Sequence, residues 1–217
     1  MIRIGVDEAG RGPVIGPLVV AGVALDEKTG ELFKRAGVKD SKMLSIRKIY
    51  QLERLVIEKA SGYKYYMLSP AEIDNREYDD TNLNYMELDE MAKIANGLNG
   101  EVVTVDSPSA NTAKVEKYLA ALVKDKKIVA RNYADRDFVE VSAASIIAKA
   151  NREKEVAAIK KEIGYDFGSG YPSDPRTTRF LKIIIDNGKI EEDVYKKNIR
   201  KSWRTINKLK EKKLSDF

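Results

Sequence analysis

The alternation of apolar and polar residues along the chain predicts five β-strands. Residues 2–8 alternate, as in a strand with one buried face, whereas residues 18–25 form a continuous apolar run typical of a central strand. Three more segments of strand length follow at 63–68, 101–106 and 127–133. Because three strands come first and two strand–helix units follow, we expect a mixed sheet with an antiparallel edge.

Apolar residues at helical spacing predict helices between and after these strands. Ser45 can cap a helix over 46–60, and Ser69-Pro70 can open a short one. Gly97 is placed to end a helix that covers 82–97. Further helices are predicted over 111–124, from about 141 to 162, and from about 174 onward. The fold class is therefore α/β, with helices flanking the sheet.

The composition agrees with a globular domain that has a real core. The chain has 217 residues, of which 43% are hydrophobic and 34% charged, which fits one domain or one domain with a small appendage. No apolar run approaches the roughly 18 residues of a membrane-spanning helix. The sequence also shows no secretory signal and no cysteine. We expect a cytoplasmic protein without membrane contact.

The absence of histidine and cysteine narrows the chemistry further. It excludes Ser-His-Asp and Cys-His catalysis, and it excludes thiolate and imidazole metal sites. A metal ion in this chain must be held by oxygen ligands, which favours Mg²⁺ or Mn²⁺ over zinc.

The net charge of +5 is weak evidence for a polyanionic partner, and its distribution is more informative. Between Lys196 and Lys213, nine basic residues face a single acid, Glu211. This basic stretch is either a solvated helix face or a surface that follows phosphates.

Four carboxylates fall where predicted strands end. Asp7 and Glu8 close the first strand, Asp106 closes the fourth, and Asp135 follows the fifth. Each alone could be an ordinary turn residue. Consecutive strand residues point to opposite faces, so Asp7 and Glu8 can share a site only where the strand turns, which Gly10 allows. Without histidine, converging carboxylates must bind cations or repel one another, and two divalent ions could serve phosphodiester hydrolysis.

Five separated motifs carry a resemblance to a known family. They are GVDEAGRGPVIGPLVVAGV (5–23), KDSKML (39–44), VDSPSA (105–110), ADRDFVEVSAASIIAK (134–149) and GSGYPSDPRT (168–177). Together they resemble the ribonuclease HII family, the type 2 ribonucleases H, in its archaeal-like single-chain form. The resemblance covers about residues 2–180. It implies an RNase-H-like catalytic domain over 1–175, with a mixed five-stranded sheet, and a basic helical extension over 176–217 packed on it.

The resemblance also implies which residues act. The catalytic and metal-binding carboxylates would be Asp7, Glu8, Asp106 and Asp135. Asp135 is preferred to Asp137 because Ala-Asp stands in the family's register before Val-Ser-Ala-Ala-Ser. Many members carry Tyr-Pro where this chain has Phe138-Val139, which puts the shape of that loop in question.

Substrate-binding residues follow in the same way. The backbone of Gly10, Arg11 and Gly12 would read the ribose 2′-OH, since only a chain without Cβ atoms approaches a sugar so closely. Tyr171 would stack on the sugar. Ser41, Lys42 and Lys149 would contact phosphates. The alternatives are a tight turn for the glycines, packing for Tyr171 and a solvated side chain for Lys149. Trp203 is expected to anchor the C-terminal helix rather than to stack on a base.

The implied function is an endoribonuclease that uses two metal ions. It would hydrolyse the bond 5′ of ribonucleotides in RNA–DNA hybrids and in DNA with embedded ribonucleotides, leaving 5′-phosphomonoesters, in DNA replication and repair. We expect a monomer. The final basic residues carry no obvious clamp-binding motif, so contact with a replication clamp cannot be derived from the sequence.

Three competing interpretations are retained. A non-catalytic hybrid-binding protein would use the same basic surface without needing four carboxylates. A glycosidase could use paired carboxylates but would work without metal and show more aromatic platforms than one Trp supplies. Ribonuclease HIII is the nearest rival, although it usually carries an extra N-terminal domain for which a signature starting at residue 5 leaves no room.

Overall fold

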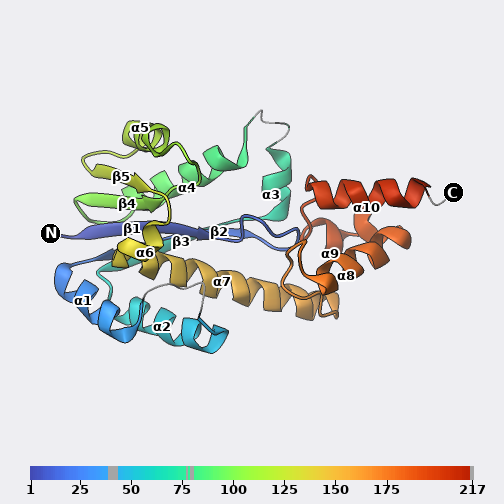
Figure 1. Ribbon diagram of the computed structural model, residues 1–217, viewed down its shortest axis with the longest axis horizontal. Coiled ribbons are helices and arrows are strands. Elements are labelled where there is room, and N and C mark those ends of the chain that lie inside the picture. The colour runs from blue at the N-terminus through green and yellow to red at the C-terminus, as the bar shows by residue number, and fades with distance from the viewer. Residues whose placement is uncertain (39–43, 77, 79–80, 216–217) are drawn as a thin grey trace. The chain divides into compact units, whose positions relative to one another are not determined.

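The computed structural model describes residues 1–38, 44–76, 78 and 81–215 of the chain. These residues form two compact units, each assembled from separate stretches of sequence (Figure 1). The first unit comprises residues 1–9, 19–67 and 82–151. The second comprises residues 10–18, 68–81 and 152–217. Among the described helices, none is long and apolar enough to cross a membrane.

A mixed five-stranded sheet forms the centre of the first unit, as predicted. Its strands are β1 (Arg3–Ala9), β2 (Leu18–Leu25), β3 (Gly62–Leu68), β4 (Val102–Asp106) and β5 (Lys127–Arg131). Their order in the sheet is β3-β2-β1-β4-β5. β1 runs antiparallel to β2 and parallel to β4, and β4 runs parallel to β5. The last strand ends two residues earlier than the sequence pattern indicated.

Helices cover both faces of this sheet (Figure 1). On one face, α4 (Leu83–Asn96) packs on β1, and α5 (Thr112–Leu122) packs on β5. On the other face lie α1 (Glu27–Ala36), α2 (Ile46–Lys59) and the first half of α7 (Val139–Ile163). Alternate residues of β2 point to this second face, where they join α1, α2 and α7 in one apolar core.

Local signals account for most helix boundaries. The Ser45 hydroxyl accepts a hydrogen bond from the Lys48 amide at the start of α2, and Gly97 caps α4. Ser69 and Glu72 form a complete capping box at α3 (Pro70–Asn75). These three predicted boundaries are confirmed.

Helix α1 was not predicted, and its composition explains why. Leu32 and Phe33 are the only large apolar residues of this ten-residue helix, and Gly30 shortly before them lowers its helix propensity. The structure shows a packing reason for this glycine, since a Cβ there would lie 3.3 Å from the side chains of Leu25 and Val139. Asp26 compensates by capping the helix through the Thr29 amide at 2.8 Å.

The second unit joins the C-terminal helices to two earlier stretches of chain. It contains α8 (Pro175–Asp186), a 3₁₀ turn η2 (Lys189–Glu191), α9 (Asp193–Lys196) and α10 (Arg204–Ser215). Val14 and Ile15 lie in its apolar core, and Ile15 forms a backbone bridge with Ile199. The helices after residue 175 therefore share a core with residues 10–18. The division of the chain at residue 175 stays a prediction.

Candidate active site

Asp7 and Glu8 occupy a stretch of β1 that extends past its parallel neighbour. The pairing of β1 with β4 ends at Val6 opposite Val105, whereas its pairing with β2 continues to Ala9. Asp7 is 4% exposed. The two carboxylates thus lie within the strand rather than after it, beside the point where β4 ends in Asp106.

Burial and repulsion act together on Asp7. Loss of water raises the pKa of its carboxyl well above the usual range, and the charges of Glu8 and Asp106 raise it further. A hydrogen bond with Ser145 and one from the Glu8 amide, at 2.8 Å, oppose this shift. Three of the four predicted carboxylates are therefore close enough to interact electrostatically.

Asp135 is linked to Asp106 through the backbone. The Asp106 Oδ1 accepts a hydrogen bond of 3.0 Å from the Ala134 amide, at the start of α6 (Ala134–Asp137). The preceding residue, Tyr133, has a φ of 60°, a conformation that costs energy outside glycine and is often found near functional sites. Asp135 is 1% exposed.

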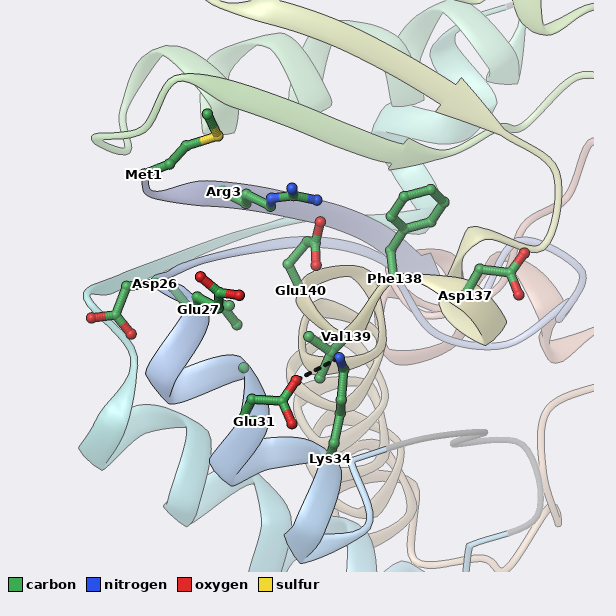
Figure 2. Close-up of a pocket in the computed structure, with 12 residues that line it drawn as sticks. Met1, Arg3, Asp26, Glu27, Glu31, Lys34, Asp137, Phe138, Val139 and Glu140 are labelled. Atoms are coloured by element: carbon green, nitrogen blue, oxygen red, sulfur yellow. Dashed lines mark hydrogen bonds and ion pairs between the residues drawn. The ribbon is translucent and has the colours of Figure 1, made fainter.

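Asp137 differs from Asp135 in its surroundings. Its side chain is exposed, and it lines a cavity at the start of β1 together with Arg3 and Glu140 (Figure 2). Asp7 and Glu8 lie towards the other end of β1. This cavity therefore takes no part in the carboxylate cluster, and the placement favours Asp135 over Asp137.

The donor set suits a hard divalent cation, but the side chains are not arranged around one. Among the described residues, no three acidic side chains form a group that could hold a metal ion. One oxygen of Asp7 and one of Asp106 each accept a hydrogen bond from a backbone amide. All-oxygen ligands and mutual repulsion fit Mg²⁺ or Mn²⁺.

The glycines predicted to read the sugar belong to the second unit. Gly10 has a φ of +95°, and a Cβ there would lie 2.6 Å from the Pro17 carbonyl oxygen and 2.7 Å from Arg152 Cδ. At Gly12 a Cβ would meet the Tyr171 ring at 3.4 Å. Close packing thus requires glycine at Gly10, and Gly12 lies beside the Tyr171 ring.

Arg152 makes a cation–π contact with the Tyr171 ring, which the sequence did not reveal. Its guanidinium lies 5.1 Å from the centre of the Tyr171 ring, and its Nη2 donates to the Ser169 carbonyl at 3.0 Å. Arg152 is only 4% exposed, whereas Tyr171 is 37% exposed. The Tyr171 ring thus contacts a buried cation while part of the side chain stays exposed.

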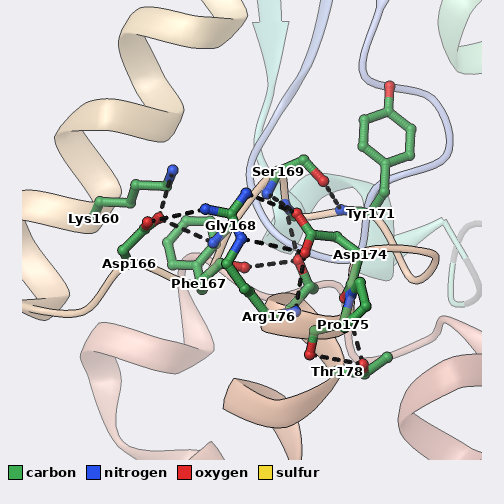
Figure 3. Close-up of polar contacts among 12 residues, drawn as sticks. Lys160, Asp166, Phe167, Gly168, Ser169, Tyr171, Asp174, Pro175, Arg176 and Thr178 are labelled. Carbon is green, nitrogen blue, oxygen red and sulfur yellow. Dashed lines mark hydrogen bonds and ion pairs between the residues drawn. The ribbon is translucent and has the colours of Figure 1, made fainter.

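A network around Asp174 shapes the loop that carries Tyr171 (Figure 3). Asp174 accepts hydrogen bonds from the amides of Ser169 at 2.8 Å and Arg176 at 2.9 Å. These bonds, followed by that from the Arg176 side chain, hold the pKa of Asp174 well below its usual range. Figure 3 shows the Tyr171 ring projecting away from this network.

Replacing Asp174 by Asn should lower the melting temperature at neutral pH by a few degrees. A carboxylate whose pKa is depressed in the folded state stabilises above its unfolded value of 3.8. That contribution is lost as the pH falls from there towards the folded pKa, so the difference between variant and wild type should shrink in acid.

Thermal melts followed by circular dichroism from pH 7 down to pH 2 measure this difference. Asp193→Asn, which removes one exposed carboxylate outside this network, provides the control. A constant difference between Asp174→Asn and wild type across the range would contradict the assignment.

Comparison with known proteins identifies the family. A sequence model of the family described as Ribonuclease HII matches residues 4–206. The chain belongs to the ribonuclease HII family. Members of this family are endoribonucleases that act on RNA–DNA hybrids and depend on divalent metal ions. The competing interpretations as a non-catalytic binder, a glycosidase or a ribonuclease HIII are thereby set aside.

Similar ribonucleases HII come from archaea. The enzyme of Thermococcus sibiricus is 40% identical, over 96% of this chain and 91% of its own length. The crystal structure of the ribonuclease H2 from Pyrococcus horikoshii OT3 is 36% identical, with a TM-score of 0.87 and 98% of both chains covered. The ribonuclease HII in a PCNA complex from Archaeoglobus fulgidus is 37% identical, with a TM-score of 0.85, covering 94% of this chain and 96% of that one. These likenesses confirm the predicted RNase-H-like fold.

The phosphate contacts predicted from the ribonuclease HII resemblance lie partly outside the described residues. Lys149 lies on α7 and is partly buried. Ser41 and Lys42 lie outside the described residues. Part of the basic C-terminal stretch is engaged within the protein, since Lys197 pairs with Glu162 and Lys201 pairs with Glu191.

Proposed function

We propose that this chain hydrolyses the phosphodiester on the 5′ side of a ribonucleotide, both in RNA–DNA hybrids and in DNA that contains single ribonucleotides. The products would be a 3′-hydroxyl and a 5′-phosphate. The observation that carries the proposal is the repulsive cluster of Asp7, Glu8 and Asp106 at the end of β1. A buried carboxylate whose pKa is raised by neighbouring negative charges is costly for the fold and is typical of sites that bind cations.

Asp7, Glu8, Asp106 and Asp135 would hold the metal, as Mg²⁺ or Mn²⁺ and with two ions during catalysis. The ions would supply activation of the attacking water and stabilisation of the leaving oxygen. The protein supplies the negative charge and the low-dielectric surroundings, because Asp7 and Asp135 are almost fully buried. Ser145 fixes the Asp7 carboxyl by a hydrogen bond, and the Ala134 amide fixes that of Asp106.

Recognition of the ribonucleotide would come from the second unit. The Gly10–Gly12 backbone can approach a 2′-OH because neither glycine carries a Cβ. Tyr171 offers a partly exposed ring, braced by Arg152, for stacking on a sugar. Ser41, Lys42 and Lys149 are proposed as phosphate contacts, with the exposed lysines of the C-terminal stretch adding long-range attraction.

This activity would serve the removal of misincorporated ribonucleotides and of primer RNA. We propose that the chain works in the cytoplasm as a monomer. The Archaeoglobus fulgidus relative is found in a PCNA complex. A sliding clamp is therefore a reasonable partner to test for this chain.

Cleavage of three matched duplexes tests the proposal. They are a DNA duplex with one ribonucleotide, an RNA–DNA hybrid and an all-DNA duplex, each incubated with Mg²⁺, with Mn²⁺ and with EDTA. We expect cuts 5′ of the ribonucleotide in the first two duplexes, only with metal, and none in the third. Cleavage in EDTA, cleavage of the all-DNA duplex, or a cut on the 3′ side would contradict the proposal.

A further inference from the structure

A buried arginine from the C-terminal segment holds the Gly10–Gly12 loop by its carbonyl groups. Arg200 is 0% exposed. Its Nη2 donates to the Gly10 carbonyl at 2.6 Å, its Nη1 to the Arg11 carbonyl at 3.0 Å, and its Nε to the Gly16 carbonyl at 3.1 Å. All these residues belong to the second unit. One rigid guanidinium thus fixes three peptide groups.

The hydrogen bonds to Arg200 also fix the direction of the amide N–H groups in this loop. In a planar trans peptide, the carbonyl of one residue and the N–H of the next point in opposite directions. Holding the Gly10 and Arg11 carbonyls towards Arg200 therefore turns the amides of Arg11 and Gly12 away from it. Within the described residues, the Gly12 amide donates to no backbone or side-chain acceptor.

Trp203 binds the carbonyl of the next residue in the loop, Gly12. Its indole Nε1 donates to the Gly12 carbonyl at 3.3 Å, and the next residue, Pro13, has no N–H. The Trp203 ring also lies 4.9 Å from the Arg200 guanidinium and 5.1 Å from that of Arg76. Arg200 and Trp203 therefore bind the carbonyls of Gly10, Arg11 and Gly12, and the peptide geometry turns the amides of Arg11 and Gly12 away from Arg200.

We infer that Arg200, assisted by Trp203, is a positioning residue that presents the Arg11 and Gly12 amides to the sugar of the ribonucleotide. Arg200 touches no substrate and acts through the loop. The inference rests on the proposed function, because it assumes that this loop distinguishes ribose from deoxyribose. A purely structural arginine would instead stabilise the fold without affecting that distinction.

Binding of two labelled duplexes to the full-length protein separates these roles. One duplex contains a single ribonucleotide and the other is all DNA, and Ca²⁺ replaces Mg²⁺ to suppress cleavage during fluorescence anisotropy. Arg200→Lys keeps the charge but loses the fork, so the preference for the ribonucleotide should fall about 10- to 100-fold, as when an orienting group is lost. Affinity for the all-DNA duplex should stay the same.

Two further variants complete the design. Trp203→Phe keeps an aromatic ring and loses the bond to the Gly12 carbonyl, so it should reduce the preference less than Arg200→Lys does. It also serves if Arg200→Lys does not fold. Arg204→Lys changes an exposed arginine on α10 and should behave as wild type. An unchanged preference in both Arg200→Lys and Trp203→Phe, or an equal loss of affinity for both duplexes, would overturn the inference.

Amide signals distinguish a failure of this inference from a failure of the proposed function. If the wild type itself shows no preference for the ribonucleotide, the proposed reading of the sugar is wrong. The ¹⁵N–¹H signals of Arg11 and Gly12 then decide on Arg200. They should shift in Arg200→Lys and stay in place in Arg204→Lys, and unchanged signals in Arg200→Lys would reject its positioning role.

Discussion

Replacing Asp7 by Asn is expected to abolish cleavage and, at the same time, to raise the melting temperature of the metal-free protein. Asp7 is buried beside the charges of Glu8 and Asp106, so its ionised form destabilises the fold at neutral pH. Asn keeps the shape and the hydrogen-bonding capacity without the charge. We expect a gain of at least about 2 °C in a chain of this size.

The pH dependence of this gain follows from the direction of the pKa shift. The folded state binds the Asp7 proton more tightly than the unfolded state does, so the cost of ionisation appears as the pH rises above 3.8 through the raised pKa. The gain in melting temperature should therefore grow with pH. Added Mg²⁺ should stabilise the wild type more than Asp7→Asn, because the cation offsets the same repulsion.

The cleavage activity of Asp7→Asn should fall, although its melting temperature rises. Cleavage of the single-ribonucleotide duplex by Asp7→Asn should fall by more than the 10- to 100-fold typical of losing a group that only supports a metal ligand. Thermal melts with and without Mg²⁺, beside initial cleavage rates, test both parts. A variant that is less stable than wild type and still active would contradict the role given to Asp7.

Gly5→Ala should cause a large loss of stability in the first unit. A Cβ at Gly5 would lie 2.1 Å from the Glu140 carbonyl carbon and 2.3 Å from the Val141 amide nitrogen, which are backbone atoms of α7. Backbone cannot rotate out of the way, so β1 and α7 must separate. We expect a loss of at least about 3 kcal/mol, the upper end for overpacked cores.

A shift of α7 would also disturb the active site, because α7 carries Ser145, which forms a hydrogen bond with Asp7. Gly62→Ala is the matched control in the same sheet, where the new Cβ would meet only the flexible Leu98 side chain at 3.3 Å. It should cost less than about 1 kcal/mol. Urea unfolding of both variants gives the comparison. Equal losses in the two would show that α7 does not lie against β1 as described.

Much of the fold was predictable because it rests on local patterns. The five strands, the Ser45 and Ser69 caps and the Gly97 boundary all follow from residues close in sequence. Helix α1 was missed because Gly30, which packs closely against Leu25 and Val139, weakens the local helical signal. The four-residue helix α6 was also missed, since one turn shows no periodicity.

The acidic side chains of the candidate site were predictable from the sequence, but the arginines that hold its loops in place were not. The resemblance named Asp7, Glu8, Asp106 and Asp135 through motifs that are contiguous in sequence. Arg152 and Arg200 act through backbone and ring contacts with residues up to 190 positions away. Such contacts leave no pattern in the sequence, because a carbonyl acceptor is present at every residue.

The four-carboxylate assignment is tested most directly by two substitutions on one substrate. Asp106→Asn and Asp137→Asn remove one acidic charge each, at the end of β4 and on the exposed side of α6. Initial rates on a single-ribonucleotide duplex with Mg²⁺ should fall more than about 100-fold for Asp106→Asn, beyond the effect of a supporting group, and stay near wild type for Asp137→Asn. Undiminished cleavage by Asp106→Asn, or a comparable loss in Asp137→Asn, would contradict the assignment.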